Sequence, residues 1–385
     1  MNLVKRVQEE LLERRRRLLA GKVNCIPSPF PRFSNDFLGI EQHCYYLLTS
    51  FSKGGKSQLG AFTFIFHPLL YAMQNPDKVR VKVLYFNLEE NQERVVQRFM
   101  SYLLYKYKGM RYSPRDLRST KNVIPIEVLN LFDTEFKSVM DFFESNVVFS
   151  TTGNATGIYK ECKAFMEERG TVYKKTYKKK NDFGMLEEHQ QFDYYIPNDP
   201  DEYVIIFVDH IGIIDTEKGM TLKQSIDKLS EYLSKYLRNR YHCSPVVIQQ
   251  QSIENEGLTA RINNQDDVSV SGLGDSKTTM RDINVLMTLS VPFRTKKTYY
   301  EGYDITRFKD NIRFLRMGLD RDGESGGICP LFFDGAVCNF EELPRPDDAE
   351  GIAKYYKRLE EMRGLRPAVT NHIITKLKKL FKQDG

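Results

Sequence analysis

The feature that most constrains the fold is an alternation of short apolar runs with helical stretches, which begins near residue 44. A parallel strand needs a crossover connection, usually a helix, before the next parallel strand can pair with it. The stretch 91–107 has apolar residues at the helical period after a capping Asn91. We therefore expect an open, mostly parallel α/β sheet flanked by helices. Its strands are the runs at 44–50, 81–88, 146–150, 203–209, 245–251, 283–289 and 311–317.

The segments on either side of this alternation have a different character. Residues 2–21 carry apolar side chains at helical spacing, interrupted by arginines at 14–17, and segment 25–36 has three prolines and no helical period. We therefore expect a linker helix in 1–28, a main α/β domain in 29–345 and a basic, helical tail in 346–385. A polar, β-prone insertion is expected at about 171–202, inside the main domain.

The composition indicates which classes of protein this chain can belong to. The 385 residues are 41% hydrophobic, which is enough for a large core. The chain has no apolar run of about 18 residues and no signal peptide, which predicts a cytoplasmic protein without a membrane partner. The six cysteines lack C-x-x-C spacing, which favours reduced thiols over a zinc site or disulfides. The net charge of +6 is compatible with a polyanionic partner.

A phosphate-binding loop is predicted where the run at 44–50 ends. The segment SFSKGGKS (50–57) follows a predicted strand and opens a helix, as a P-loop does. Lys56 would reach the β- and γ-phosphates of ATP, and the Ser57 hydroxyl would hold Mg²⁺. Ser50 stands where the usual pattern has glycine, and a flexible surface turn is the alternative. The residues expected to bind the nucleotide are Ser52, Lys53, Gly54, Gly55, Lys56, Ser57 and Gln58.

Two carboxylates are predicted to complete this site. The run YVIIFVD ends in Asp209, where a central strand would bring a carboxylate to the metal ion; a helix cap or turn is the alternative. Glu89 and Glu90 follow the run VLYFN, just before a helix. Ligands bind at the carboxyl ends of the strands in such sheets, so a glutamate there could polarise the attacking water. The alternative is a solvated acidic first turn, favoured by the helix dipole.

Together these motifs resemble those of the DnaB-like replicative helicases, part of the RecA-like superfamily. The resemblance runs from about residue 30 to 342, with the insertion outside it. VLYFNLEENQERVVQRF is similar to the family's S-L-E-M strand and E-Q-L-x-x-R helix, which implies that Glu89 is the catalytic base. PVVIQQQS is similar to the strand P-V-V-x-L-S-Q-L, which implies that Gln251 couples the γ-phosphate to DNA-binding loops.

The resemblance continues towards the C-terminus. DSKTTMRDINVLMTL is similar to S-G-S-I-E-Q-D-A-D-V-I-M-x-L, with Asp282 at the acidic position. GLDRDGESGG is similar to G-K-Q-R-N-G-x-x-G, which a terminal β-hairpin follows in the family, and implies that Arg321 is an arginine finger. Leu319 replaces the lysine two residues before the finger, so one of the two cations expected to offset γ-phosphate charge is missing.

The function that the resemblance implies is that of an ATP- and Mg²⁺-dependent DNA helicase motor in replication. An arginine finger acts on a neighbouring subunit, so a homo-oligomer is expected, in this family a hexameric ring. Single-stranded DNA would pass through the ring, held by loops in 252–281 with Arg261, Lys277 and Arg281 as candidate contacts. A primase or a loader is a further expected partner. If a phage encodes this protein, the expected location is the cytoplasm of the host.

Several alternatives remain open at the level of sequence. A RecA- or KaiC-like ATPase would act on DNA without unwinding it, a P-loop kinase would phosphorylate a small molecule, and a scaffold would have lost its ATPase activity. The helix at 2–21 would pack either on an adjacent subunit or on its own domain. The lysines at 174–180 would either contact nucleic acid or form a solvated charge run.

Overall fold

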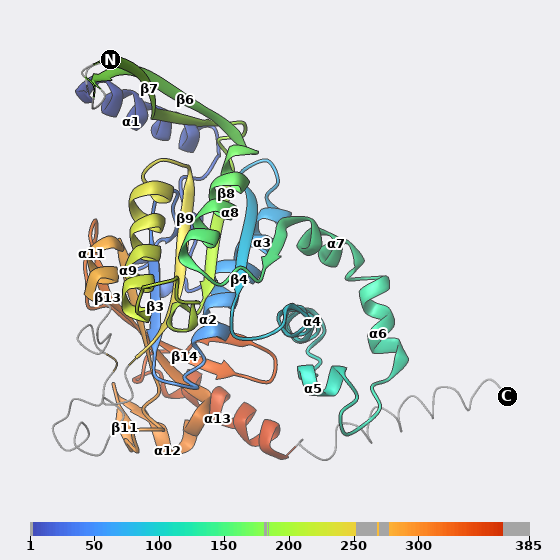
Figure 1. The fold of residues 1–385 in the computed structure, drawn as a ribbon. Coiled ribbons are helices and arrows are strands. Elements are labelled where there is room, and N and C mark those ends of the chain that lie inside the picture. Colours follow the sequence, from blue (N-terminus) through green and yellow to red (C-terminus); the bar gives the residue numbers. More distant parts are fainter. Residues whose placement is uncertain (1–2, 181–182, 184, 252–267, 269–276, 365–385) are drawn as a thin grey trace.

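The computed structural model describes residues 3–180, 183, 185–251, 268 and 277–364. Within these ranges, the centre is a nine-stranded sheet in the order β15-β14-β13-β10-β3-β9-β8-β4-β5 (Figure 1). The six strands from β10 to β5 are parallel, which confirms the predicted sheet. They are β3 (Tyr46–Ser50), β4 (Arg80–Asn87), β5 (Val147–Ser150), β8 (Glu202–Asp209), β9 (Cys243–Gln250) and β10 (Val285–Ser290).

Strand burial explains why the apolar runs predicted the sheet so well. All seven runs are strands of this sheet, and in β8 alternate side chains enter the hydrophobic clusters on its two faces. Parallel pairing brings the carboxyl ends of β3, β9, β8 and β4 to one edge. There Ser50 pairs with Gln250, and Asn87 pairs with Asp209. The loops that follow these strands are therefore neighbours.

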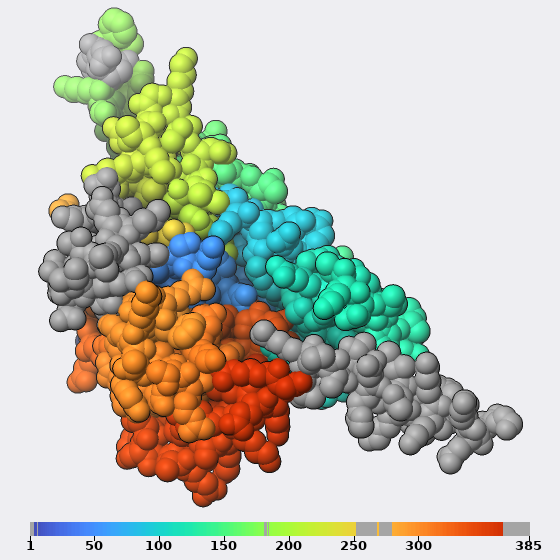
Figure 2. All heavy atoms as spheres, turned by 90° about the horizontal axis from the view of Figure 1, so that it is seen from below, coloured from blue at the N-terminus to red at the C-terminus, as the bar shows by residue number. Residues whose placement is uncertain are grey.

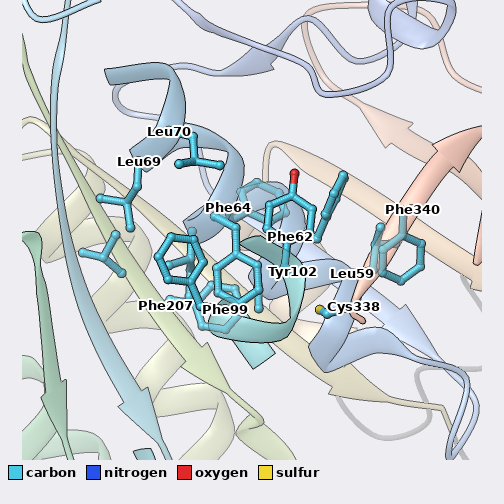
Figure 3. Close-up of a cluster of buried hydrophobic side chains, with 14 of the residues drawn as sticks. Leu59, Phe62, Phe64, Leu69, Leu70, Phe99, Tyr102, Phe207, Cys338 and Phe340 are labelled. Carbon is cyan, nitrogen blue, oxygen red and sulfur yellow. The ribbon is translucent and has the colours of Figure 1, made fainter. Parts of the chain in front are cut away.

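Helices cover both faces of the sheet. On one face, Phe62 packs against Tyr102 and Phe340 at ring distances of 5.6 and 5.5 Å, which fixes the helix that follows β3 (Figure 3). This face carries α2 (Lys56–Ala61), the π-helix η2 (Phe62–Phe66), α3 (His67–Gln74), α4 (Gln92–Lys108), α6 (Ile126–Asp133) and α7 (Lys137–Asn146). The other face carries α8 (Ala155–Glu167), α9 (Leu222–Glu231) and the π-helix η4 (Tyr232–Arg238). The short helix α5 (Pro114–Leu117) follows α4.

The helix predicted at 91–107 is α4. Asn91 holds its N-cap position, although its side chain makes no capping hydrogen bond. Among the described helices, none is long and apolar enough to cross a membrane.

The C-terminal part extends the sheet with antiparallel strands. β13 (Ile312–Asp320) pairs with β10 and with β14 (Ile328–Asp334), and β14 forms the predicted terminal hairpin with β15 (Asn339–Glu342). The small hairpin β11 (Tyr299–Tyr300) and β12 (Tyr303–Asp304), with α12 (Ile305–Phe308) and α13 (Ala349–Gly364), packs beside it around a third hydrophobic cluster. Helix α13 begins the predicted tail, and 365–385 lie outside the described residues.

The predicted insertion is a long hairpin that projects from the body. β6 (Gly170–Lys180) and β7 (Leu186–Pro197) pair antiparallel and lie beside α1 (Leu3–Leu19) in Figure 1. The hairpin is buried at its base, where the Tyr195 hydroxyl donates to the Met166 carbonyl at 2.9 Å. Its lysines at 174–180 are exposed.

Helix α1 confirms the helix predicted at 2–21, but its apolar side chains do not enter the core. An ion pair between Arg17 and Asp201, at 2.7 Å, holds the C-terminal end of the helix on the domain. Beyond this anchor, Leu11 is 61% exposed and Leu19 is 71% exposed, and the apolar residues at 4, 7, 12 and 18 are exposed as well. The alternative in which this apolar side packs on its own domain is therefore not what the structure shows.

Two connecting segments differ from expectation. The segment 25–36 lacks helical period, as predicted, but it buries Phe30 and Phe33 between the short strands β1 (Ile26–Pro27) and β2 (Gly39–Ile40). The prediction that 252–281 is one loop is wrong for its described end, because Lys277–Asp282 form helix α11. This helix packs against α9, where Ser230 donates to Asp282 at 2.8 Å.

Candidate active site

The phosphate loop connects the end of β3 to the start of α2, as predicted. Gly55 has φ +99°, a left-handed conformation that favours glycine. At Gly54 an added Cβ would lie 1.9 Å from the Ser50 hydroxyl oxygen, so only glycine fits beside Ser50. Ser50 therefore replaces the usual first glycine without blocking the turn. The structure thus supports the P-loop over the flexible-turn alternative.

Lys56 and Ser50 are the polar groups of the loop that most need a ligand. Lys56 is only 6% exposed, and none of the ion pairs among the described residues involves it. The Ser50 hydroxyl is fully buried and has no hydrogen-bond partner in the part of the chain that the structure describes. Burying an ammonium group without a counter-charge is costly. Both groups therefore fit an anion that the loop would enclose.

Asp209 lies next to the loop, at the end of β8. Its carboxylate accepts hydrogen bonds from the Ser57 hydroxyl at 3.1 Å and from the Tyr85 hydroxyl at 3.4 Å. Asp209 is 1% exposed, and burial raises its pKa to about 6, with a smaller contribution from the negative charge of Glu89. A hydroxyl beside one carboxylate suits Mg²⁺, which keeps most of its ligands as water and phosphate oxygens. The predicted pair of Ser57 and Asp209 is thus brought together.

Glu89 faces a histidine that immediately follows Asp209. The Nδ1 atom of His210 accepts the Gly212 N–H at 3.2 Å, which leaves Nε2 as the protonated nitrogen of the neutral ring. That Nε2 atom lies 3.8 Å from the Glu89 carboxylate. Burial and the charge of Lys56 lower the pKa of His210, so the ring is neutral at pH 7. Glu89 itself is 49% exposed, so its carboxylate is open to water, and the His210 ring lies near it without a direct hydrogen bond.

Glu90 has a different role. Its carboxylate forms a two-pronged ion pair with Arg98 on α4, in which Nη2 donates to Oε2 at 2.8 Å. A carboxylate engaged by a guanidinium in this way is a poor proton acceptor. The geometry therefore distinguishes the two glutamates and leaves Glu89 as the candidate base.

Two arginines that the sequence analysis missed hold the phosphate loop from behind. Arg313 on β13 is 1% exposed, and its Nε donates to the Gly54 carbonyl at 2.7 Å. It also donates to the Asp310 carbonyl at 2.9 Å, while burial lowers its pKa to about 10. Arg294 donates to the Ser52 carbonyl at 2.9 Å. These bonds tie the Ser52 and Gly54 carbonyls of the loop to β13 and to the segment after β10.

Gln251 is where the resemblance places it, at the end of β9 next to β3. Its backbone N–H donates to the Ser50 carbonyl at 3.0 Å, and its side-chain Nε2 donates to the Thr49 hydroxyl at 3.2 Å. It is 2% exposed. The residues that follow it, up to 267, lie outside the described part of the chain, and Arg261 is among them.

Arg321 lies at the opposite edge of the sheet. It follows β13, whose Asp320 pairs with Val285, and Val285 pairs with Tyr46 at the amino end of β3. The Arg321 side chain is exposed and donates to the carbonyl of Arg281, which is also exposed. For Lys277 only the backbone, at the start of α11, is described. Arg321 thus does not join the other predicted residues within one chain.

A basic cavity of about 1090 Å³ adjoins Gln58, between α4, α5 and the turn that joins β14 to β15. Its walls include Arg94, Arg98, Arg111, Arg115 and Arg118. Two of these arginines are neutralised by the Glu90 and Asp334 carboxylates. The remaining positive charge favours anionic ligands on this side of the site.

The surface view agrees with an accessible site. In Figure 2 the blue segment near residue 50 reaches the surface between the cyan-to-teal segment and the orange segment. The residues that the sequence analysis missed here are Tyr85, His210, Arg294 and Arg313. The available signal was a charged or polar residue inside or directly after an apolar run, as with the arginine in NIRFL.

Comparisons with known proteins found similar structures but no relative by sequence. No protein-family model matches the chain, and no curated protein matches it. Among solved structures, the ATPase domain of a helicase is similar with a TM-score of 0.60 and 14% identity, over 88% of this chain and 99% of that one.

A DnaB-like replicative helicase, solved in a study of its interactions with primase, is similar with a TM-score of 0.57 and 14% identity. The match covers 89% of this chain and 66% of the helicase chain, so this chain spans about two thirds of its length. The chain therefore has the RecA-like α/β fold of the ATPase domains of DnaB-like helicases.

Proposed function

We propose that this protein is an ATP-hydrolysing DNA helicase motor. The observation that carries the proposal is the convergence of Lys56, Ser57, Asp209 and Glu89 at the carboxyl edge of the sheet. Lys56 and Asp209 are buried, and Ser57 bonds directly to Asp209. In water-excluded surroundings such charges act strongly on a phosphoryl group. The fold shared with helicase ATPase domains supports the same function.

Each residue has a role that follows from its place. Lys56 and the loop N–H groups would bind the β- and γ-phosphates, and Arg313 and Arg294 keep the loop in shape. Ser57 and Asp209 would hold Mg²⁺, which offsets phosphate charge when bound. Glu89, which lies 3.8 Å from His210, would take the proton of the attacking water. Gln251 would transmit the state of the γ-phosphate from β9 to the segment that follows.

The distance between the two edges of the sheet supports an oligomer. Arg321 lies at the amino edge, so a finger role requires the nucleotide of another subunit. Head-to-tail contacts of this kind generate rings or filaments, and we propose a hexameric ring. The exposed apolar side of α1 provides a surface for the neighbouring subunit. Burying it there would remove apolar area from water.

The proposed output is translocation on single-stranded DNA and unwinding of duplex during replication. DNA would be held inside the ring by the segment between β9 and β10, which includes Arg261, Lys277 and Arg281. The similarity to a helicase studied with its primase makes a primase a proposed partner.

The test measures ATP hydrolysis with and without single-stranded DNA for the wild type and for Lys56→Ala. We expect stimulation by DNA in the wild type, loss of hydrolysis in Lys56→Ala, and ATP-dependent separation of a forked duplex. DNA-stimulated hydrolysis without strand separation would indicate a recombination or regulatory ATPase. Hydrolysis that DNA does not stimulate would contradict the proposal and favour a small-molecule kinase.

A further inference from the structure

Asn87, the last residue of β4, has a side chain that the fold leaves unsatisfied. It is 7% exposed, and neither Nδ2 nor Oδ1 has a hydrogen-bond partner in the part of the chain that the structure describes. Buried amides in folded proteins are nearly always hydrogen-bonded, and one without partners is destabilising. Such a group calls for an explanation, and a ligand that supplies the missing partners is the most direct one.

The position of Asn87 indicates which ligand this is. Asn87 pairs in register with Asp209 on the adjacent parallel strand, and residues in register project from the same face. Tyr85, two residues earlier on the same face, donates to the Asp209 carboxylate at 3.4 Å. The Asn87 amide therefore lies beside Asp209, whose carboxylate accepts the Ser57 hydroxyl. It also comes two residues before Glu89.

We propose that Asn87 contacts the bound Mg²⁺–nucleotide complex, with Oδ1 accepting from a water of the metal ion and Nδ2 donating to a terminal phosphate oxygen. This inference rests on the proposed ATPase function and adds a residue to the same site. Asparagine suits the position because it supplies both a donor and an acceptor without charge. An aspartate here would place a second buried carboxylate against Asp209, and the two negative charges would repel each other.

The test compares Asn87→Leu with the wild type in two measurements. Leucine has a similar volume and removes both orphaned groups. Without nucleotide, we expect the unfolding midpoint of Asn87→Leu to equal or exceed that of the wild type. With Mg²⁺ and a non-hydrolysable ATP analogue, calorimetry should show binding weaker by roughly tenfold or more, the loss expected when two hydrogen bonds are removed together. Asn87→Ser, which keeps a hydroxyl, should recover part of this affinity.

A matched control comes from the other face of the sheet. The Ser225 hydroxyl on α9 is also fully buried without a partner among the described residues. Ser225→Ala should leave nucleotide binding unchanged, because α9 covers the face of the sheet opposite the helix that follows the phosphate loop.

Three outcomes are decisive. Binding by Asn87→Leu as tight as that of the wild type, while Lys56→Ala loses binding, would overturn this inference alone. A lower unfolding midpoint of nucleotide-free Asn87→Leu would overturn it too, because the amide would then have partners within the fold. If Lys56→Ala bound the ATP analogue as tightly as the wild type, the proposed function itself would be contradicted.

Discussion

The two halves of the proposed active site lie at opposite edges of one sheet and are built in opposite ways. At the carboxyl edge, Lys56 and Asp209 are 6% and 1% exposed and surrounded by the loop and neighbouring strands. At the amino edge, Arg321 is exposed and held by a backbone carbonyl. Burial positions charges before a ligand arrives, whereas exposure leaves a charge available to a second molecule. The contrast supports the proposal that the phosphate site is built within one subunit and that Arg321 acts on a second one.

The largest effect is expected from the exposed half. Arg321→Ala should lower kcat for ATP by about 10³-fold or more while nucleotide binding stays within about threefold, because a finger acts in the transition state. Mixing Arg321→Ala with Lys56→Ala subunits should restore part of the hydrolysis, since some interfaces then combine an intact loop with an intact finger. Arg316→Ala is the control, because Arg316 is bonded to Glu301 at 2.6 Å in its own chain. No recovery in the mixture would contradict a finger shared between subunits.

The next effect tests the distinction between the two glutamates. Glu89→Gln should lower kcat about 10²-fold or more, because it removes the proposed base. Glu90→Gln should change kcat less than about tenfold, because Glu90 neutralises Arg98 and does not face His210. Both rates are measured at saturating ATP. Equal losses of kcat in the two variants would contradict the assignment of Glu89, and not Glu90, as the base.

The third prediction concerns pH. The pKa of Asp209 is about 6 in the folded chain and near the ordinary 3.8 in the unfolded chain, so the folded state binds more protons between about pH 4 and 6. The Asp209 contribution to stability therefore falls as pH rises through this window. Above it, the ionised carboxylate costs the nucleotide-free protein roughly 2–3 kcal/mol.

Asp209→Asn should remove this cost. In urea denaturation without nucleotide, the variant should gain stability over the wild type at pH 7.5 and gain little at pH 4. The same variant should lose Mg²⁺-dependent ATP binding. A stability difference that is the same at both pH values would show that Asp209 does not titrate in this range.

The smallest effect tests the support behind the loop. Arg313→Lys keeps the charge but loses the forked set of donors that reaches the Gly54 and Asp310 carbonyls. We expect roughly tenfold weaker ATP binding, the loss of about one net hydrogen bond, with oligomer formation unchanged. Calorimetry and sedimentation measure the two properties. Unchanged affinity would mean that the loop holds its shape without Arg313.

The sequence predicted those parts of the fold that depend on residues close together in the chain, such as a run of buried side chains or a turn. The apolar runs predicted the six parallel strands and β13, because these strands are largely buried, and the loop glycines are fixed by local geometry. The pairing of Ser57 with Asp209 was also predicted, since Asp209 ends one strand and Ser57 lies just after the loop that follows another. The functions assigned to Glu89, Gln251 and Arg321 stay predictions.

Other features depend on contacts between distant segments. Arg313 is a charge in an apolar run, and only the approach of β13 to the phosphate loop explains it. The choice between Glu89 and Glu90 required the positions of His210 and Arg98. The polar composition of 252–281 favoured a loop, whereas packing against α9 makes its end helical.

The hairpin β6–β7 leaves α8 and returns at the start of β8, the end of that strand remote from Asp209. Its strands pair with each other and not with the central sheet. Changes in its length therefore need not shift the register of β8. The arm can therefore lengthen or shorten without moving Asp209 at the far end of β8.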